Sequence, residues 1–532
     1  MTEKVQDNYE KLSDVEHVLL RPGMYIGSIT SDDEMRYVFN EDIKKFEKRM
    51  IKYNPGFLKL FDEIISNSVD ESKRKGSKLT SINVVIDKEN GFISVEDNGG
   101  IPVEIHKKTG LYIPTLCFSE MRAGSNFKKD EDRTGVVGTN GLGSVAANIF
   151  SQKFVVDTCD GKKSFHQDFL NNMSVKHEPV ITSSRKHGTT ITYYPDFERF
   201  GMTSLDDDMF KCIEYRVYEV AGTNPKLNIT FNGHKIEIKS FLEFCKMFTD
   251  EEIIYEENVN WQVGVAPCKD GFNQISYACG TATWVGGTHV DYIINQFMPT
   301  IREYIKKKTK SDISPAQVKN HMIIFINASV NNVQFSSQTK ERLTTDPKKF
   351  DTSIELSKKF ITSITKSEIV SLITDWLDTK KQADEKAAIR DANRQVSKLK
   401  IEKLVDCKYA GTAKKNETML FITEGDSAAS GYRKYRNPNT QALFPVLGKI
   451  LNVQIANKTS IRANKEIIGI MSAMGLKFGE SPFEYANTEK VKINLSDGEL
   501  ICDLEDEVCI DGKFITVKEL IGERKMKRVD LF

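Results

Sequence analysis

Residues 57–70, FLKLFDEIISNSVD, constrain the fold of this chain more than any other stretch. The apolar residues recur at the three- and four-residue spacing of a helix, which predicts a helix with one buried face. Glu63, Asn67 and Asp70 fall together on a different face. Glu63 could take a proton from water, and Asn67 could hold a divalent ion such as Mg²⁺ through its carbonyl oxygen. The alternative is an ordinary amphipathic helix with a polar outer stripe.

Composition limits the classes of protein to consider. The 532 residues suggest roughly three or four domains, and 75 basic side chains balance 75 acidic ones. A net charge of zero gives no support for a nucleic-acid partner, so any basic surface must be local. Nine cysteines without a CxxC pair predict reduced thiols in a cytoplasmic protein. The N-terminus is too charged for a signal peptide, and no apolar run reaches about 18 residues, so we expect no membrane partner.

Two strands with a turn between them are expected over residues 81–87 and 92–96. The second strand leads into Asp97, Asn98 and the adjacent glycines Gly99 and Gly100. A carboxylate at a strand end, beside a backbone without side chains, can face a planar ligand at close range. Asp97 could accept a hydrogen bond from an exocyclic amine such as that of adenine. A hairpin turn made of its usual residues is the alternative.

A glycine-rich segment at residues 135–144 precedes an apolar helix expected over residues 145–150. Glycines before a helix start leave several backbone N–H groups free to point at one anion, so this segment could cradle a triphosphate. The segment is neither a P-loop nor a dinucleotide fingerprint. Strands over residues 188–196 and 228–231, with a helix over 216–224, indicate an α+β fold in which helices are layered on a mixed sheet.

The motifs EIISN, EDNGGIP, GTNGLGS and HGTTITYYPD, at residues 63–67, 96–102, 138–144 and 187–196, resemble the GHKL ATPases. This superfamily includes gyrase B, eukaryotic topoisomerase II, MutL and the histidine kinases. The start LRPGMYIGS, at residues 20–28, resembles its type II topoisomerase branch. The resemblance implies a GHKL (Bergerat) ATPase sandwich that uses ATP and Mg²⁺.

The resemblance also implies a role for each matching residue. Glu63 would be the general base for water, Asn67 the Mg²⁺ ligand and Asp97 the adenine reader. Gly99 and Thr189 would support the adenine side. The phosphates would be wrapped by a lid made of Gly138, Thr139, Asn140, Gly141, Leu142 and Gly143. Two departures stand out: Gly99 and Gly100 are adjacent where the family usually has a residue between them, and Asn126 replaces a lysine of gyrase B-like members.

A second region contains strands expected over residues 261–266, 273–279 and 322–328. A helix is expected to open at the motif GGTHV and run through Phe297. A loop lysine is a natural partner for a terminal phosphate, and Gln338 and Lys340 would point the same way on an extended chain. Lysines are also common in any surface loop. GGTHV and FSSQTKERL resemble the ribosomal S5-like transducer domain of type II topoisomerases, which implies that Lys340 reaches the γ-phosphate and Gln338 helps to place it.

The last region follows a helical linker expected over residues 379–408. A strand at 418–422 leads into Glu424, and a carboxylate at the carboxyl end of a strand can bind metal. A helix cap formed by Asp426 or Ser427 is the alternative. FITEGDSA and PVLGKILNV resemble the Rossmann-like TOPRIM domain of type II topoisomerases. The resemblance implies that Glu424 is a Mg²⁺ ligand and general acid/base at DNA cleavage, with Lys449 and Asn452 near the DNA; Leu447 replaces a usual basic residue.

The Asp-x-Asp that completes a TOPRIM site is missing, and no winged-helix region supplies a DNA-attacking tyrosine. We therefore expect an α/β multidomain chain with a GHKL ATPase domain (1–235), a transducer (236–378), the linker and a partial TOPRIM domain with a short β-rich extension (409–532). It resembles the large subunit of T-even bacteriophage type II topoisomerases, which would act in the host cytoplasm. The implied partners are double-stranded DNA, a second copy at the ATPase domain, and subunits carrying the missing ligands and tyrosine. An ATP-gated DNA clamp or scaffold without cleavage activity is the alternative.

Overall fold

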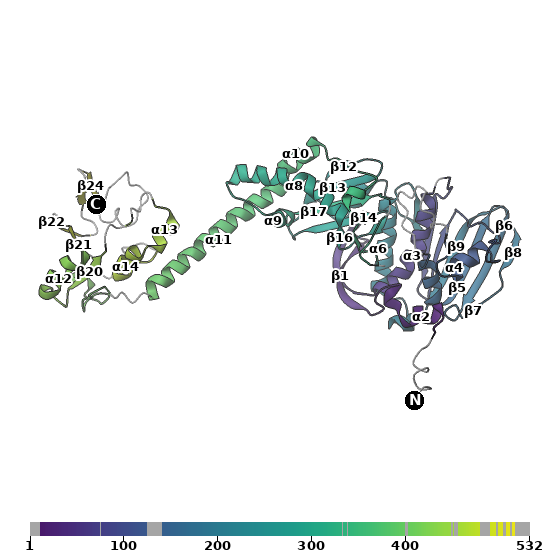
Figure 1. The fold of residues 1–532 in the computed structure, drawn as a ribbon, viewed down its shortest axis with the longest axis horizontal. Helices are drawn as coiled ribbons and strands as arrows, with labels where there is room; N and C mark the ends of the chain where they lie inside the picture. The colour runs from purple at the N-terminus through teal and green to yellow at the C-terminus, as the bar shows by residue number, and fades with distance from the viewer. Residues whose placement is uncertain are drawn as a thin grey trace, which may run out of the picture. The chain divides into compact units, whose positions relative to one another are not determined.

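The computed structural model describes residues 11–74, 76–124, 141–331, 333–337, 339–398, 403–447, 451 and 456–478, and the backbone of strands between 490 and 516. The chain forms two compact units, Met1–Asp375 and Trp376–Phe532 (Figure 1). Among the described helices, none combines the length and the apolar character needed to span a lipid bilayer.

The first unit is built on a nine-stranded sheet in the order β11-β10-β3-β4-β9-β5-β6-β7, with β8 paired to β6 (Figure 1). β10 runs parallel to β3, and the other neighbours are antiparallel. Alternate side chains of β3 and β4 are buried, so helices cover one face of the sheet. The strands are β3 (Ser81–Asp87), β4 (Phe92–Asp97), β5 (Ser151–Asp160), β6 (Lys163–Leu170), β7 (Val175–Lys176), β8 (Val180–Ser183), β9 (His187–Pro195), β10 (Asn228–Phe231) and β11 (His234–Lys235).

The central helix of this unit is α3 (Pro55–Ser72), which packs against α5 (Gly143–Ile149), α6 (Asp207–Thr223) and β4. Asn54 caps α3 by accepting a hydrogen bond from the Phe57 N–H, and Pro55 occupies the first turn, where no partner for its nitrogen is needed. Phe57, Phe61 and Ile65 are almost fully buried. Each contributes about 1.5–3 kcal/mol through burial, which fixes the rotation of α3 about its axis.

Several shorter elements of the first unit lie in the chain before the second sheet. They are α2 (Asp14–Leu20), η1 (Pro22–Met24), the paired strands β1 (Asp32–Asn40) and β2 (Lys45–Tyr53), α4 (Ile113–Ser119), η2 (Phe197–Phe200) and α7 (Phe241–Cys245). The β1–β2 hairpin was not predicted, because its polar residues break the alternation that marks a half-buried strand.

A second sheet in the first unit has the order β12-β13-β17-β14-β15, and all residues of its central strand β17 are buried. A short parallel pair joins β16, directly before α8 in the chain, to β18, which follows β17. The elements are β12 (Ile254–Glu257), β13 (Trp261–Pro267), β14 (Asn273–Ala278), β15 (Thr281–Ala282), β16 (Gly286–Gly287), α8 (Thr288–Thr309), α9 (Pro315–Lys319), β17 (Met322–Ala328), β18 (Arg342–Leu343), η3 (Pro347–Lys349) and α10 (Lys358–Lys366).

In the second unit, β19 runs parallel to both β20 and β21, and β22 is antiparallel to β21. The long helix α11 (Glu368–Lys398) begins in the first unit and continues into the second. The remaining elements are η4 (Lys415–Glu417), β19 (Met419–Glu424), α12 (Gly425–Tyr435), β20 (Gln441–Val446), α13 (Lys458–Ala463), α14 (Lys465–Ala473), β21 (Lys490–Leu495), β22 (Gly498–Asp503), β23 (Glu507–Ile510) and β24 (Lys513–Thr516).

Several predicted elements match the structure residue for residue, namely β3, β10 and β17. Helix α8 continues to Thr309, well beyond the predicted end at Phe297. Ile301 and Ile305 extend its buried face past Pro299, and this packing outweighs the backbone hydrogen bond that the proline removes.

Candidate active site

Glu63 lies on α3 between two ammonium groups. Its Oε1 atom is 2.7 Å from Lys59 Nζ, one turn earlier, and 3.4 Å from Lys340 Nζ, which comes from the loop before β18. Burial disfavours the charged form of Glu63, but Lys340 and Lys59 outweigh it and hold the pKa of Glu63 below its usual range. The carboxylate is therefore ionised and held in place by two cations.

The neighbouring carboxylate, Asp62, shares the same lysine. Lys59 Nζ is 2.9 Å from Asp62 Oδ2, and Arg216 Nε of α6 is 2.8 Å from Asp62 Oδ1. Burial opposes the charge on Asp62, yet Lys59 and Arg216 hold its pKa far below the usual range. Sequence analysis missed both cations. The spacing of Lys59 three and four residues before the two carboxylates was a usable signal, whereas nothing local points to Arg216.

The start of α5 lies directly against Glu63. A Cβ atom added to Gly143 would come within 1.8 Å of Glu63 Oε2, so only glycine allows this approach. Gly141 has a left-handed backbone with φ of 58°, and its carbonyl accepts a hydrogen bond of 2.9 Å from the Arg122 N–H. Leu142 is the residue before α5. The other predicted lid residues, Gly138, Thr139 and Asn140, lie outside the described part of the chain.

Asp97 ends β4 beside the far end of the same helix. Its Oδ2 accepts a hydrogen bond of 2.6 Å from Ser68 Oγ on α3, and its Oδ1 accepts one of 2.9 Å from the Gly99 N–H. Burial raises the pKa of Asp97. Thr189 of β9 is the direct cross-strand partner of Asp97, and its hydroxyl bonds that of Thr158 at 2.9 Å. The structure thus brings Asp97, Gly99 and Thr189 together, and it adds Ser68, which sequence analysis missed.

The adjacent glycine pair has a local explanation. Gly100 adopts a left-handed backbone with φ of 87°, and a Cβ there would lie 2.3 Å from the Cys159 carbonyl oxygen. A Cβ on Gly99 would be only 3.1 Å from Asp97 Oδ1. Gly100 is crowded by β5, and Gly99 is crowded by the Asp97 carboxylate. Although the two glycines are adjacent here, the backbone beside Asp97 therefore still lies close to its neighbours without a side chain in between.

Asn67 lies one turn after Glu63 on α3 and is exposed, whereas Asp70 is buried. Glu63, Asn67 and Asp70 lie on one helix at the predicted spacing, and this face passes from exposed at Asn67 to buried at Asp70. Within the described ranges, no group of three or more acidic, histidine or cysteine side chains is arranged to hold a metal ion. A single exposed amide still suits Mg²⁺, which keeps several waters and takes further oxygens from substrate phosphates.

The Lys340 loop is anchored through the motif GGTHV. β16, which is Gly286–Gly287, pairs with β18, and a Cβ on Gly287 would lie 2.4 Å from the Leu343 carbonyl oxygen. Lys340 itself has a left-handed backbone with φ of 61°, so the prediction of an extended chain is wrong at this residue. A Cβ on Gly27 would lie 2.9 Å from Thr339 Cγ2, which places the LRPGMYIGS turn against the loop. Gln338 lies outside the described residues.

In the second unit, Glu424 ends β19 and is exposed immediately before α12. No side chain caps the start of α12, so the predicted alternative of a cap by Asp426 or Ser427 is wrong. The parallel strand β21 ends at the same edge of the sheet as Glu424. Lys449 and Asn452 lie outside the described residues, and their proposed DNA contacts stay predictions.

Comparisons with known proteins agree with this geometry. Residues 54–199 match the family of histidine kinase-, DNA gyrase B- and HSP90-like ATPases, and residues 227–392 match the DNA gyrase B family. The ATPase region of Saccharomyces cerevisiae topoisomerase II, bound to dexrazoxane, is 35% identical, with a TM-score of 0.66 over 70% of this chain and 99% of that one. This chain belongs to the type II DNA topoisomerase family.

Other members of the topoisomerase family show which part of a longer relative this chain matches. The ATPase and transducer domains of the Balamuthia mandrillaris enzyme are 34% identical, with a TM-score of 0.67 over 71% of this chain and 99% of that one. DNA topoisomerase 2 of Arabidopsis thaliana is 37% identical over 494 residues, which are 89% of this chain but 33% of that protein. The chain thus spans about a third of the length of such relatives. The predicted GHKL ATPase and transducer folds are confirmed.

Proposed function

We propose that this chain is the ATP-hydrolysing large subunit of a type II DNA topoisomerase that passes one DNA duplex through a transient break in another. The observation that carries the proposal is the Glu63 carboxylate, whose Oε1 lies 3.4 Å from Nζ of Lys340 in the loop before β18. Because the base on α3 contacts a cation from a loop that follows the second sheet in the chain, hydrolysis at this site can move that loop relative to α3. Relaxation and decatenation during replication would be the outcome.

Each part of the site has a role in binding ATP. Asp97 accepts a hydrogen bond from the adenine amine, with Gly99 and Thr189 beside it. The turn at Gly141 and Gly143 follows the phosphates, since the backbone at Gly143 lies against Glu63 without an intervening side chain. Mg²⁺, when bound, would neutralise charge on the phosphate oxygens, and Asn67 would hold it.

Glu63 acts as the general base. It accepts a proton from a water whose oxygen attacks the γ-phosphorus, while the bond to the leaving ADP oxygen breaks. Lys340 has to move from Glu63 to reach a γ-phosphate. This movement removes one of the cations that lower the pKa of Glu63, so the carboxylate becomes a stronger base as the phosphate gains a counter-charge.

The second unit would take part in DNA cleavage. Glu424 would bind Mg²⁺ and act as general acid/base, with Lys449 and Asn452 near the DNA. Partner subunits of a bacteriophage-type enzyme would supply the remaining carboxylates and the tyrosine, and two copies of this chain would close over one duplex. A cytoplasmic location fits the reduced thiols expected from the sequence.

The test uses the whole chain with Mg²⁺ and ATP. We expect ATP turnover that duplex DNA stimulates, and relaxation of supercoiled DNA only when candidate partner subunits and ATP are both added. A Glu424→Gln chain in the same mixture should keep turnover and lose relaxation. DNA-stimulated turnover without relaxation in any mixture would instead identify a clamp or scaffold, and absence of ATP turnover would overturn the proposal.

A further inference from the structure

A buried network of alternating charges joins α3 to the second sheet through α6. Arg216 Nε is 2.8 Å from Asp62 Oδ1, and Arg216 Nη1 is 3.3 Å from Glu219 Oε2. Glu219 Oε1 in turn accepts a hydrogen bond of 2.9 Å from the Tyr277 hydroxyl of β14. Arg216 Nη2 also donates to the Gly280 carbonyl at 3.2 Å. The guanidinium is therefore bonded on one side to the ATPase helix and on the other to the second sheet.

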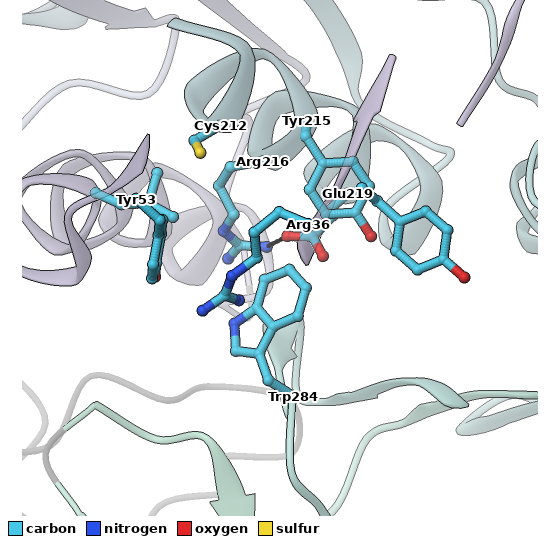
Figure 2. A pocket seen from close by; sticks show the side chains of 9 residues that line it. Arg36, Tyr53, Cys212, Tyr215, Arg216, Glu219 and Trp284 are labelled. Atoms are coloured by element: carbon cyan, nitrogen blue, oxygen red, sulfur yellow. Dashed lines mark hydrogen bonds and ion pairs between the residues drawn. The ribbon is translucent and has the colours of Figure 1, made fainter. Parts of the chain in front are cut away.

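The network is shielded from solvent. The Arg216 and Glu219 side chains are 5% and 1% exposed. Figure 2 shows both among the side chains that line a small cavity, together with Arg36, Tyr53 and Trp284. The Arg36 guanidinium lies 3.9 Å from the centre of the Tyr53 ring and 4.9 Å from that of Trp284, so aromatic faces close this side. Removing one partner from such a buried set leaves an unpaired charge, so the loss of any one of these contacts is expected to disturb the others.

Charges balance along the network when every group is ionised. The cations are Lys340, Lys59 and Arg216, and the anions are Glu63, Asp62 and Glu219. Lys59 is the shared member, because its Nζ contacts Glu63 and Asp62 at once. The position of the Lys59 ammonium between Asp62 and Glu63 depends on whether a second cation neutralises Asp62. Arg216 is that second cation.

We propose that Arg216 is a positioning residue for ATP hydrolysis, which holds Glu63 in place through Asp62 and Lys59 and links it to the second sheet through Glu219 and Tyr277. With Arg216 on Asp62 Oδ1, Lys59 stays between both carboxylates. Without Arg216, Asp62 draws Lys59 toward itself and the Glu63 carboxylate turns away from its present position. A base displaced by about 1 Å loses on the order of 10²-fold in rate.

Asp62 and Glu63 of α3 are therefore held by two routes, one from the loop before β18 and one from strand β14 of the second sheet. Lys340 contacts Glu63 directly, and Tyr277 acts on Asp62 through Glu219 and Arg216. A shift of the second sheet together with the loop before β18, relative to α3, changes both contacts. This gives the second sheet control over the position of the base, separate from the proposed contact of Lys340 with the phosphate.

The experiment compares substitutions that remove one group each. Arg216→Met should lower kcat about 10²-fold, while KM for ATP and the Kd of a non-hydrolysable ATP analogue stay within about threefold. Tyr277→Phe removes only a hydroxyl that donates to a carboxylate, and should lower kcat about tenfold with the same unchanged binding. Tyr193→Phe is the matched control, because the Tyr193 hydroxyl is buried on β9 with no partner among the described residues. It should leave kcat unchanged.

This inference rests on the proposed role of Glu63, so Glu63→Gln is measured alongside. Near wild-type turnover in Glu63→Gln would overturn the proposed function itself. Loss of turnover in Glu63→Gln, with equal kcat in Tyr277→Phe and Tyr193→Phe, would overturn only the positioning role. Tyr277→Phe keeps the test decisive if Arg216→Met fails to fold, and a parallel loss of analogue binding and kcat in either variant would also contradict the proposal.

Discussion

Replacing Lys340 with methionine separates its two contacts, the observed one with Glu63 and the proposed one with a γ-phosphate. Methionine keeps most of the length and apolar surface of lysine while removing the charge. The Lys340 ammonium lies 3.4 Å from Glu63 Oε1, whereas Lys59 Nζ lies 2.7 Å from the same atom and remains in the variant. The shorter contact therefore keeps Glu63 paired when Lys340 is gone.

The magnitudes follow from these distances. A contact of 3.4 Å is longer than the ~2.7–2.9 Å of a strong charge-assisted hydrogen bond, and Lys59 keeps Glu63 paired in its absence, so its loss should cost about 1 kcal/mol of stability. A charge-assisted bond to a transferring phosphoryl group contributes about 1.5–3 kcal/mol, which corresponds to about 10- to 150-fold in kcat. We expect Lys340→Met to fold normally, with a melting temperature within a few degrees of wild type and a large loss of turnover.

The assay is steady-state ATP hydrolysis together with thermal denaturation of the same preparations. Thr339→Val is a control in the same loop, because it changes a side chain next to Gly27 without removing a charge. A kcat within twofold of wild type in Lys340→Met would refute the role of Lys340 at the γ-phosphate. A large fall in melting temperature with normal kcat would show that the ion pair with Glu63 is purely structural.

Further predictions concern three other positions. Gly143→Ala should lower kcat about 10²-fold or more, since the new Cβ would meet Glu63 Oε2 at 1.8 Å; normal turnover in a steady-state assay would contradict this. Asp97→Asn should weaken binding of an ATP analogue about tenfold or more in calorimetry, because a charge-assisted bond to the adenine amine is lost, and unchanged affinity would argue against adenine at this site. Burial raises the pKa of Glu219 from 4.5 to about 7, so the folded protein binds this proton more tightly than the unfolded chain and wild-type stability falls as pH rises through this interval. Glu219→Gln should therefore gain about 3 kcal/mol relative to wild type between pH 4 and pH 8, and an equal melting difference at both pH values would exclude this.

The sequence allowed prediction of features that depend on neighbouring residues. The helical spacing of the apolar residues around Glu63 located α3, and the β-branched runs located β3 and β17, because periodicity and burial are local properties. Asp97 was also predicted from local sequence, because it stands at the end of a strand and directly before a turn that contains two glycines. The roles assigned to these residues came from family resemblance and remain proposals.

Features that depend on tertiary contacts were not predicted. Arg216 contacts Asp62 of α3 from 154 positions away in the chain, and Tyr277 contacts Glu219 of α6 from 58 positions away. No local pattern distinguishes either residue from other buried side chains. The β1–β2 hairpin was missed because its strands alternate poorly. Lys340 has a left-handed backbone in the loop before β18, and the interpretation of this segment as an extended chain gave no sign of it.

The most direct test of the central claim is single-turnover hydrolysis of ATP by Glu63→Gln, with nucleotide binding measured on the same sample. Glutamine preserves the size of the side chain and removes its ability to accept a proton. The account predicts that nucleotide still binds with nearly wild-type affinity while the hydrolytic step slows by about 10²–10⁴-fold. Hydrolysis at the wild-type rate with nucleotide bound would contradict the assignment of Glu63 as the base.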